Sequence, residues 1–437
     1  MKHPLIETLK NLRGNARGAV YTEPMWGIPF NLYAPYVSVY MLALGLVDSQ
    51  IGLIASISLV GQFFSSLVSG VLTDKYGRKL TTLISDIISW SIPTLIWAIA
   101  QDFRYFLVAA IINSAWRISM TSWSCLLVED TDQKLIVDIY SWIYIANYVV
   151  AFFAPIAGLL INRFTLVPTM RGLYLFASIM MTLKFFVMNN MVTETRQGVV
   201  RMEETRNKHL FSLLGENRGV FRQILRTPVT LFTLTLMVIM SINMMITSTF
   251  WSILVTQRLL VPEQYLAIFT TVKSVIMLLF FFTLMPRLRE MDARGPMILG
   301  FIFFIVSQIM LISMPPQAYF LLFITIILDA CAVPMTSTFL DRLVVVSIDP
   351  KERARIMAIL YVTVLAFTSP FGWIAGKLSE INRALPFLLS ITLFLVAVML
   401  LVISKRLPHL YAGNIHPDAA LETALETAPE TALNGAS

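Results

Sequence analysis

The chain is poor in charge. Only 14% of its 437 residues are charged, 57% are hydrophobic and the mean hydropathy is +0.73. Soluble globular proteins carry about a quarter charged residues. The segments 27–46 and 387–404 contain no charged residue. Water is therefore not the main solvent of this chain, and the composition excludes an ordinary soluble domain.

Cysteine and histidine are also scarce. The two cysteines, Cys125 and Cys331, lie inside apolar runs and lack the spacing of metal ligands. The histidines lie near the termini or in the central polar segment, where they cannot form a catalytic cluster at a membrane surface: His3, His209, His409 and His416. No G-x-x-x-x-G-K-[ST] phosphate loop occurs. We therefore expect no metal, no cofactor, no enzyme activity and an ion gradient as any energy source.

Long apolar runs fill most of the sequence. A hydrocarbon core about 30 Å thick needs roughly 20 apolar residues per helix. Polar residues and turn signals such as Pro315-Pro316 separate runs of that length, and Asp48 or Ser49 is the expected cap of the second. The sequence predicts an all-α polytopic membrane protein with twelve transmembrane helices: 25–46, 51–72, 80–100, 105–127, 138–161, 172–191, 229–256, 264–285, 296–314, 317–340, 355–377 and 385–404.

Basic residues concentrate on one side of these spans. With a cytoplasmic N-terminus, 24 of the 33 Lys and Arg residues fall on the cytoplasmic side and 6 outside. The other three lie within spans. Cytoplasmic loops carry such an excess, so we expect both termini in the cytoplasm. This bias also explains the pI near 9.4 without a nucleic-acid partner.

The longest interior polar segment divides the spans six from six. We expect two six-helix bundles at 21–191 and 229–405, joined by a cytoplasmic linker at 192–228. Residues 1–20 form a cytoplasmic segment, either a flexible leader or an amphipathic helix on the membrane. Residues 406–437 repeat Ala-Leu-Glu-Thr and are expected to be disordered.

An offset of 218 residues aligns the two halves. It matches Asp74 with Asp292 and Gly77 with Gly295. The same offset matches Ile156-Ala157-Gly158 with Ile374-Ala375-Gly376. Agreement of two distant segments on one offset predicts two pseudo-symmetric halves, a plan that places a substrate site near the membrane midplane between them.

The loop Gly70-Val-Leu-Thr-Asp74-Lys75-Tyr76-Gly77-Arg78-Lys79 resembles the signature loop between the second and third helices of the major facilitator superfamily. The resemblance implies a secondary transporter with alternating access. It also implies that Asp74 and Arg78 lock the second helix to the start of the eleventh, with Glu129 or Asp130 holding Arg78. The alternative is that these charges only mark a solvated loop. The implied cytoplasmic gate comprises Gly70, Asp74, Gly77, Arg78, Lys79, Glu129 and Asp130.

Three ionisable residues are predicted deep within spans, where a charge is costly and is usually functional. Arg117 lies on one helical face with Asn113 and Thr121. By resemblance, this span lines the central cavity. Lys273 and Asp329 fall within roughly one helical turn of the same depth, so we expect an ion pair. The pair is either structural or exchanges a proton as Lys273 changes partner.

Other polar side chains fall at similar depth on several spans. They predict a wet cavity, although aromatic stripes at helical spacing more often serve packing. The remaining members of the predicted substrate and proton cavity are Asn31, Tyr36, Tyr144, Asn147 and Asn243. Asp86 and Lys184 are expected to be structural.

The predicted function is proton-coupled transport of a small neutral or anionic organic solute, because the three deep charges sum to plus one. Two alternatives stay open. Ala154-Pro155-x-x-Gly158 resembles part of an antiporter motif and favours a multidrug efflux antiporter. Thr193-Glu194-Thr195-Arg196 resembles part of a sugar-porter motif and favours a sugar symporter. We expect a monomer in a lipid bilayer, in a bacterial-type plasma membrane.

Overall fold

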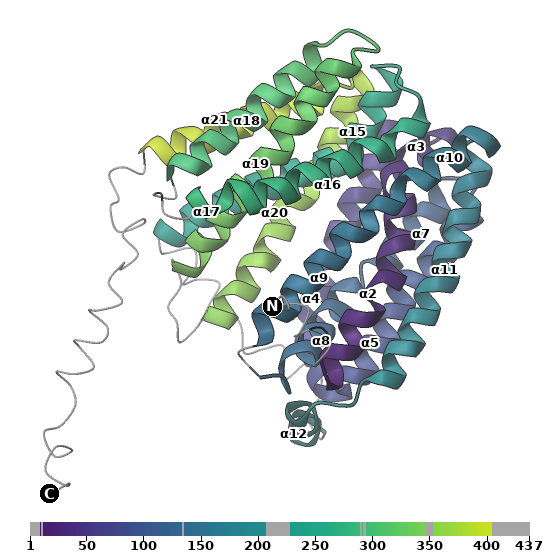
Figure 1. The fold of residues 1–437 in the computed structure, drawn as a ribbon, viewed down its shortest axis with the longest axis vertical. Helices are drawn as coiled ribbons and strands as arrows, with labels where there is room; N and C mark the ends of the chain where they lie inside the picture. The colour runs from purple at the N-terminus through teal and green to yellow at the C-terminus, as the bar shows by residue number, and fades with distance from the viewer. Residues whose placement is uncertain are drawn as a thin grey trace, which may run out of the picture.

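The computed structural model describes residue 9 and residues 12–132, 135–206, 228–288, 291, 294–346 and 353–403. Within that part of the chain every regular element is a helix. The helices form two bundles, one from each half of the sequence, shown in purple to teal and in green to yellow in Figure 1.

The N-terminal half makes six helical passes, several of which are broken and restarted at prolines. Pro35, Pro93 and Pro155 each lie in the first turn of a new helical piece, where the missing backbone N–H leaves no bond unmade. The passes are α2 (Gly14–Tyr33), η1 (Ala34–Tyr36) and α3 (Val37–Ala43); α4 (Asp48–Tyr76); α5 (Arg78–Asp86), η2 (Ile87–Ser91) and α6 (Ile92–Ala98); α7 (Phe103–Asn113) and α8 (Trp116–Val128); α9 (Ile136–Val150), η4 (Ala151–Phe153) and α10 (Ala154–Phe164); and α11 (Leu166–Met191).

The C-terminal half follows the same plan with longer unbroken helices. A short helix, α12 (Arg196–Thr205), stands before it in the linker. As expected, Pro315 and Pro316 lie between α18 and α19. The passes are α15 (Pro228–Gln257); η6 (Glu263–Tyr265), α16 (Leu266–Thr283) and α17 (Met285–Leu288); α18 (Arg294–Ser313); α19 (Tyr319–Val346); α20 (Arg353–Ile381); and α21 (Leu385–Ile403).

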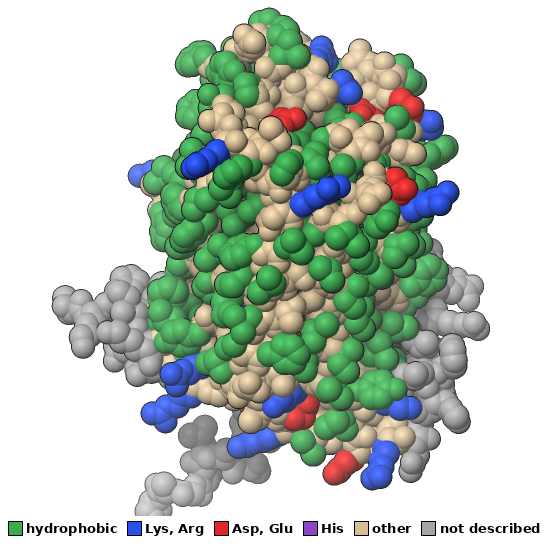
Figure 2. Space-filling model, turned by 90° about the vertical axis from the view of Figure 1, so that its right-hand side faces the viewer, with side chains coloured by type: hydrophobic (Ala, Val, Ile, Leu, Met, Phe, Trp, Pro, Cys, Tyr) green, Lys and Arg blue, Asp and Glu red, His purple; other side chains and the backbone are tan. Residues whose placement is uncertain are grey.

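Among the described residues, ten helical segments are long and apolar enough to cross a membrane. Two more passes, 14–43 and 103–128, are helical but interrupted, which is consistent with the twelve predicted. The fold class is confirmed as an all-α polytopic membrane protein. Its flank is a belt of hydrophobic side chains, with charged side chains gathered above and below it (Figure 2). Leu159 and Ile179 are 70% and 68% exposed, as lipid-facing residues should be.

Two predicted boundaries differ from the structure. The first helix begins at Gly14, so residues 14–20 continue the first pass. The Asn15 amide explains this, since it donates to the Thr193 carbonyl and accepts from the Thr193 N–H at 3.0 and 2.8 Å. Neither Asp48 nor Ser49 caps α4, because Val47 occupies that position and its N–H donates to Gln50. Asp292 and the tail at 406–437 lie outside the described residues.

The two halves meet at one end of the molecule. We call this the Asp48 end, predicted to be extracellular, and the opposite one the Arg78 end, predicted to be cytoplasmic. Helix α4 packs along α20, and α10 packs on α16. Figure 1 shows the halves converging at the top, the Asp48 end, and the C-terminal half leaning away below.

Candidate functional site

A network of charges surrounds Arg78. Its side chain is only 4% exposed and forms ion pairs with Glu129 at 3.0 Å and Asp74 at 3.1 Å. Of the two predicted partners, Glu129 is the one that holds Arg78. Asp130 instead accepts a bond from the Arg196 backbone N–H at 3.3 Å. A guanidinium this deeply buried requires such pairing.

Glu194, which lies in the linker, caps the N-terminus of α5, the first helix of the third pass. Its two carboxylate oxygens accept the backbone N–H groups of Arg78 and Lys79, each at 2.9 Å, at the positive end of α5. Gly77 makes room for this contact. Its φ is +82°, and a Cβ there would lie 2.5 Å from a Glu194 oxygen. Thr195 donates its hydroxyl at 2.5 Å to Glu129, which joins the cap to the Arg78 ion pairs.

The predicted lock joins the second helix to the start of the eleventh, where the side chains of residues 353–356 lie outside the described part of the structure. The partners that the structure gives Arg78 lie in α4 and just after α8, within the N-terminal half. Thr205 of α12 donates to the Asp74 carbonyl at 3.2 Å. The network therefore docks the linker on the loop. Gly70 has open space where a Cβ would stand, and nothing in the structure explains its glycine.

At the Asp48 end the halves touch backbone to backbone. A Cβ on Gly52 of α4 would lie 2.3 Å from the Gly372 carbonyl of α20, and one on Gly376 would lie 2.8 Å from the Asp48 carbonyl. The Trp373 N–H donates to the Ser56 hydroxyl at 2.7 Å. Real Cβ atoms do not approach this closely, so only glycine permits the contact.

A second close contact between the halves lies at Gly158, the residue that the 218-residue offset matches with Gly376. A Cβ on Gly158 of α10 would lie 2.2 Å from the Gln264 carbonyl, beside η6 and α16. The duplicated Ile-Ala-Gly therefore supplies one glycine to each side of the closed end. Tyr36 is fully buried, and its hydroxyl stands beside Gly158. It packs in this closed layer.

The Asp48 carboxylate also joins the halves. It accepts the Ser379 hydroxyl at 2.6 Å and the Arg383 Nε–H at 3.4 Å. Asp48 is 5% exposed and Arg383 is 34% exposed, so the ion pair runs from the buried contact to the surface.

The structure brings Lys273 of α16 and Asp329 of α19 together as an ion pair. Their side chains are 29% and 17% exposed, so neither is sealed in the core.

Arg117 of α8 is placed differently from the other deep charges. Its Nε donates to the Gln62 amide of α4 at 3.2 Å, and its guanidinium stacks 4.3 Å from the Trp116 ring. It is also near enough to Tyr361 of α20 for an electrostatic interaction. No carboxylate of the described residues lies within ion-pair distance of it. Arg117 therefore interacts electrostatically with the other half and has no carboxylate partner among the described residues.

The other predicted cavity residues are bonded in several ways. Asn243 accepts from Gln308 at 2.8 Å with both side chains buried, which makes it a structural contact between α15 and α18. Asn113 donates to the Ser89 carbonyl at 2.6 Å. Three partly buried side chains donate to carbonyls one turn earlier in their own helices: Asn31, Thr121 and Asn147. The Tyr144 side chain lies outside the described part of the structure.

Comparison with known proteins identifies the family to which the chain belongs. The family model described as Major Facilitator Superfamily matches residues 26–372. The chain belongs to the Major Facilitator Superfamily. It is therefore an integral membrane transporter and not an enzyme. None of the curated proteins compared by sequence matches the chain.

Solved structures of Major Facilitator Superfamily transporters share the fold. A mutant of the nucleoside transporter NupG is 14% identical, with a TM-score of 0.72 over 89% of this chain and 99% of that one. A POT family transporter in complex with a thioalcohol-conjugated peptide is 15% identical, with a TM-score of 0.67 over 92% and 99%. At these identities the likeness concerns the fold.

Several residues of this Major Facilitator Superfamily protein were not identified as site residues from the sequence. Glu194 lies in the motif that resembles the sugar-porter pattern, which was used only to suggest a subfamily. Asp48 is predicted as a helix cap, and Arg383 lies between the last two predicted spans without any motif. Gln62 and Gln308 are amide side chains within largely apolar runs, and no motif includes them.

Proposed function

We propose that this protein moves a small organic solute, neutral or anionic, by proton-coupled alternating access, and that an anion is the preferred cargo. The proposed class of cargo rests on Arg117. This residue interacts electrostatically with Tyr361 of α20 and has no carboxylate partner among the described residues. A guanidinium is a bidentate partner for a carboxylate or phosphate group. An anionic solute would supply the missing partner.

Proton coupling is proposed for the Lys273–Asp329 pair. Removing one partner of a semi-buried ion pair leaves an uncompensated charge, which costs several kcal/mol. If Lys273 turns toward a solute or another group, protonation of Asp329 relieves that cost. Solute binding and proton uptake at one site would then be linked.

In the proposed cycle, the Asp48 end and the Arg78 end open in turn. The glycine contacts and the Asp48 ion pair support a state closed at the Asp48 end. The Arg78 network, held within the N-terminal half, would engage the other half when that end closes. The names of the similar structures, a nucleoside transporter and a peptide-bound POT family member, concern polar organic solutes, in keeping with this class.

The cargo class is tested by a thermal-stability screen of the purified protein with organic anions, neutral polar solutes and organic cations, followed by uptake of the hits into liposomes. We expect anions to be the stabilising class. Arg117→Gln should weaken their binding about tenfold or more, the usual effect of losing a charge-assisted pair. Arg163→Gln, an exposed arginine of α10, is the matched control. Stabilisation by cations, or hits unaffected by Arg117→Gln, would contradict the proposal.

A further inference from the structure

Two opposite charges lie deep within the N-terminal half, and the sequence predicts only a structural role for them. Asp86, the last residue of α5, is 6% exposed, and Lys184 of α11 is 4% exposed. The two interact electrostatically. Among the described residues, however, neither forms an ion pair with the other or with any further group. Buried charges are usually held by a partner in direct contact, so this arrangement is unusual.

Polar groups from three other helices surround Asp86. Helix α5 has nine residues, so Asp86 lies about 12 Å along it from Arg78. Ser119 of α8 donates its hydroxyl to the Asp86 carboxylate. Among the described residues, the charged groups that interact electrostatically with Asp86 are Lys184 and Glu23 of α2. Asp86 is therefore bounded by a hydroxyl in contact, a cation at a distance and a second carboxylate.

A polar seam and a narrow cavity connect Asp86 with the Arg78 end. Thr82 lies between Arg78 and Asp86 on the same face of α5, and it donates to the Ser122 hydroxyl of α8 at 2.8 Å. The cavity measures about 10 Å³, and its lining extends from Lys79, in the first turn of α5, to Asp86. One water molecule needs about 10–15 Å³. The path from the Arg78 end to Asp86 is therefore short and partly polar.

The helix changes type directly after Asp86. Residues Ile87–Ser91 form a π-helical turn, a feature found frequently at functional sites. Two hydroxyls of α11 fix this turn, since Ser178 donates to the Ser91 carbonyl at 3.0 Å and Thr182 to the Ser91 hydroxyl at 2.7 Å. These bonds hold the segment that follows Asp86 against the helix that carries Lys184.

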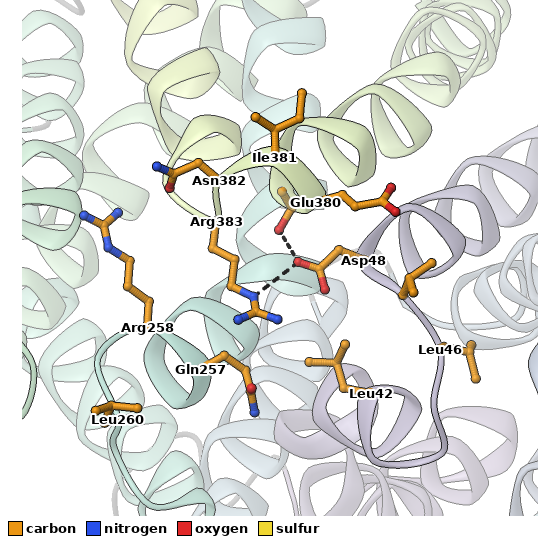
Figure 3. Close-up of a pocket in the computed structure, with 12 residues that line it drawn as sticks. Leu42, Leu46, Asp48, Gln257, Arg258, Leu260, Glu380, Ile381, Asn382 and Arg383 are labelled. Carbon is orange, nitrogen blue, oxygen red and sulfur yellow. Dashed lines mark hydrogen bonds and ion pairs between the residues drawn. The ribbon is translucent and has the colours of Figure 1, made fainter.

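Carboxylates at the Asp48 end are placed differently. Around the cavity of about 780 Å³ there, Asp48 pairs with Arg383 and Glu380 pairs with Lys377. Figure 3 shows Arg383 reaching toward Asp48. A cation in contact favours the ionised carboxylate. The group in contact with Asp86 is a hydroxyl, which can donate to a carboxylate and can equally accept from a protonated carboxyl.

We propose that Asp86 is a proton-binding residue of the N-terminal half, reached from the Arg78 end, with Lys184 as the countercharge of its ionised form. The arriving proton binds a carboxylate oxygen, and the new O–H donates to the Ser119 hydroxyl. No other bond forms or breaks, and the charge of the interior rises by one. The inference goes beyond the proposed function, because this proton is separate from the Lys273–Asp329 pair and its binding requires neither solute nor transport.

The test is infrared difference spectroscopy of the purified full chain, comparing mildly alkaline with mildly acidic buffer. We expect a protonated-carboxyl band that appears on acidification, is lost in Asp86→Asn and is unchanged in exposed Glu203→Gln. Asparagine keeps the size of the side chain and an acceptor for Ser119, so this variant should fold. Ser119→Ala should shift the frequency of the band, because the carboxyl loses its hydrogen-bond partner.

Lys184→Gln separates a proton site from a permanently ionised structural group. Without the cation, Asp86 should take up its proton at about tenfold or more lower proton concentration. A difference spectrum with no band that depends on Asp86 would overturn the site, as would a band that neither Ser119→Ala nor Lys184→Gln alters. If the band disappears only in Asp329→Asn, the proton occupies the proposed coupling pair, and this inference fails while the proposed function stands.

Discussion

The individual residue with the widest influence at the Arg78 end is Glu194. It caps α5 through two backbone N–H groups, and the neighbouring Thr195 bonds to Glu129, which in turn holds Arg78. Residues from three separate segments therefore depend on one another. The loop is a docked assembly and not a solvated turn.

Removing members of this network should destabilise the protein to different degrees. Arg78→Ala leaves Glu129, 17% exposed, without its cation, at a cost of about 3–5 kcal/mol. Glu194→Gln keeps some capping and should cost about 1 kcal/mol. Thermal unfolding in detergent measures both, with exposed Glu203→Gln of α12 as control. Equal melting temperatures for Arg78→Ala and wild type would contradict the account.

The two signature-loop glycines should respond differently to alanine. At Gly77 the positive φ and the Glu194 oxygen both oppose a Cβ, so Gly77→Ala should lower stability by about 1–3 kcal/mol. Gly70→Ala fills open space on a helix and should be neutral or stabilising by up to about 1 kcal/mol. The same unfolding assay applies, and a reversed order would contradict the structure.

At the scale of elements, the closed end depends on two helix pairs that cross where glycines remove the side chains. Gly52, Gly372 and Gly376 bring α4 and α20 together, and Gly158 does the same for α10 and α16. Gly158 and Gly376 are at pseudo-symmetric positions, so each half contributes one of these glycines to the contacts that close this end.

A bulky side chain at this crossing should hold the Asp48 end open. In a variant with Cys125 and Cys331 replaced by serine, Ser56→Cys reports on the buried contact, since Ser56 is 7% exposed. Adding Gly52→Leu should raise its rate of labelling by a membrane-impermeant maleimide about tenfold or more. Gly172→Leu, at a glycine with open space around it, is the control. Unchanged labelling with Gly52→Leu would argue against closure at this contact.

The sequence predicted elements and local partners better than distant ones. Span length predicted the helical passes, and the 218-residue offset predicted the two halves. Depth along two helices predicted the Lys273–Asp329 pair. In contrast, Asp48 and Arg383 are 335 residues apart, and Arg78 and Glu194 are 116 apart, with no periodicity linking them. Such pairs depend on how the helices cross. The pattern of apolar residues along each helix does not determine these crossings.

At the scale of the whole molecule, the two ends differ. The close glycine contacts between the halves lie near the Asp48 end, while the partners that the described residues give Arg78 lie in the N-terminal half. Between them lie Arg117 in one half and Lys273 with Asp329 in the other. We interpret this arrangement as one state of a cycle in which solute and proton meet between the halves.

The central claim is that Asp329 couples the proton to the solute. It is tested most directly in liposomes, by comparing solute exchange at equal pH with accumulation driven by a pH gradient. Because Asp329→Asn alone leaves Lys273 unpaired, the double variant Lys273→Gln with Asp329→Asn is measured beside it, and Glu203→Gln serves as control. We predict that exchange persists in at least the double variant while gradient-driven accumulation falls about tenfold or more in both. Accumulation at the wild-type level in either variant would contradict the account.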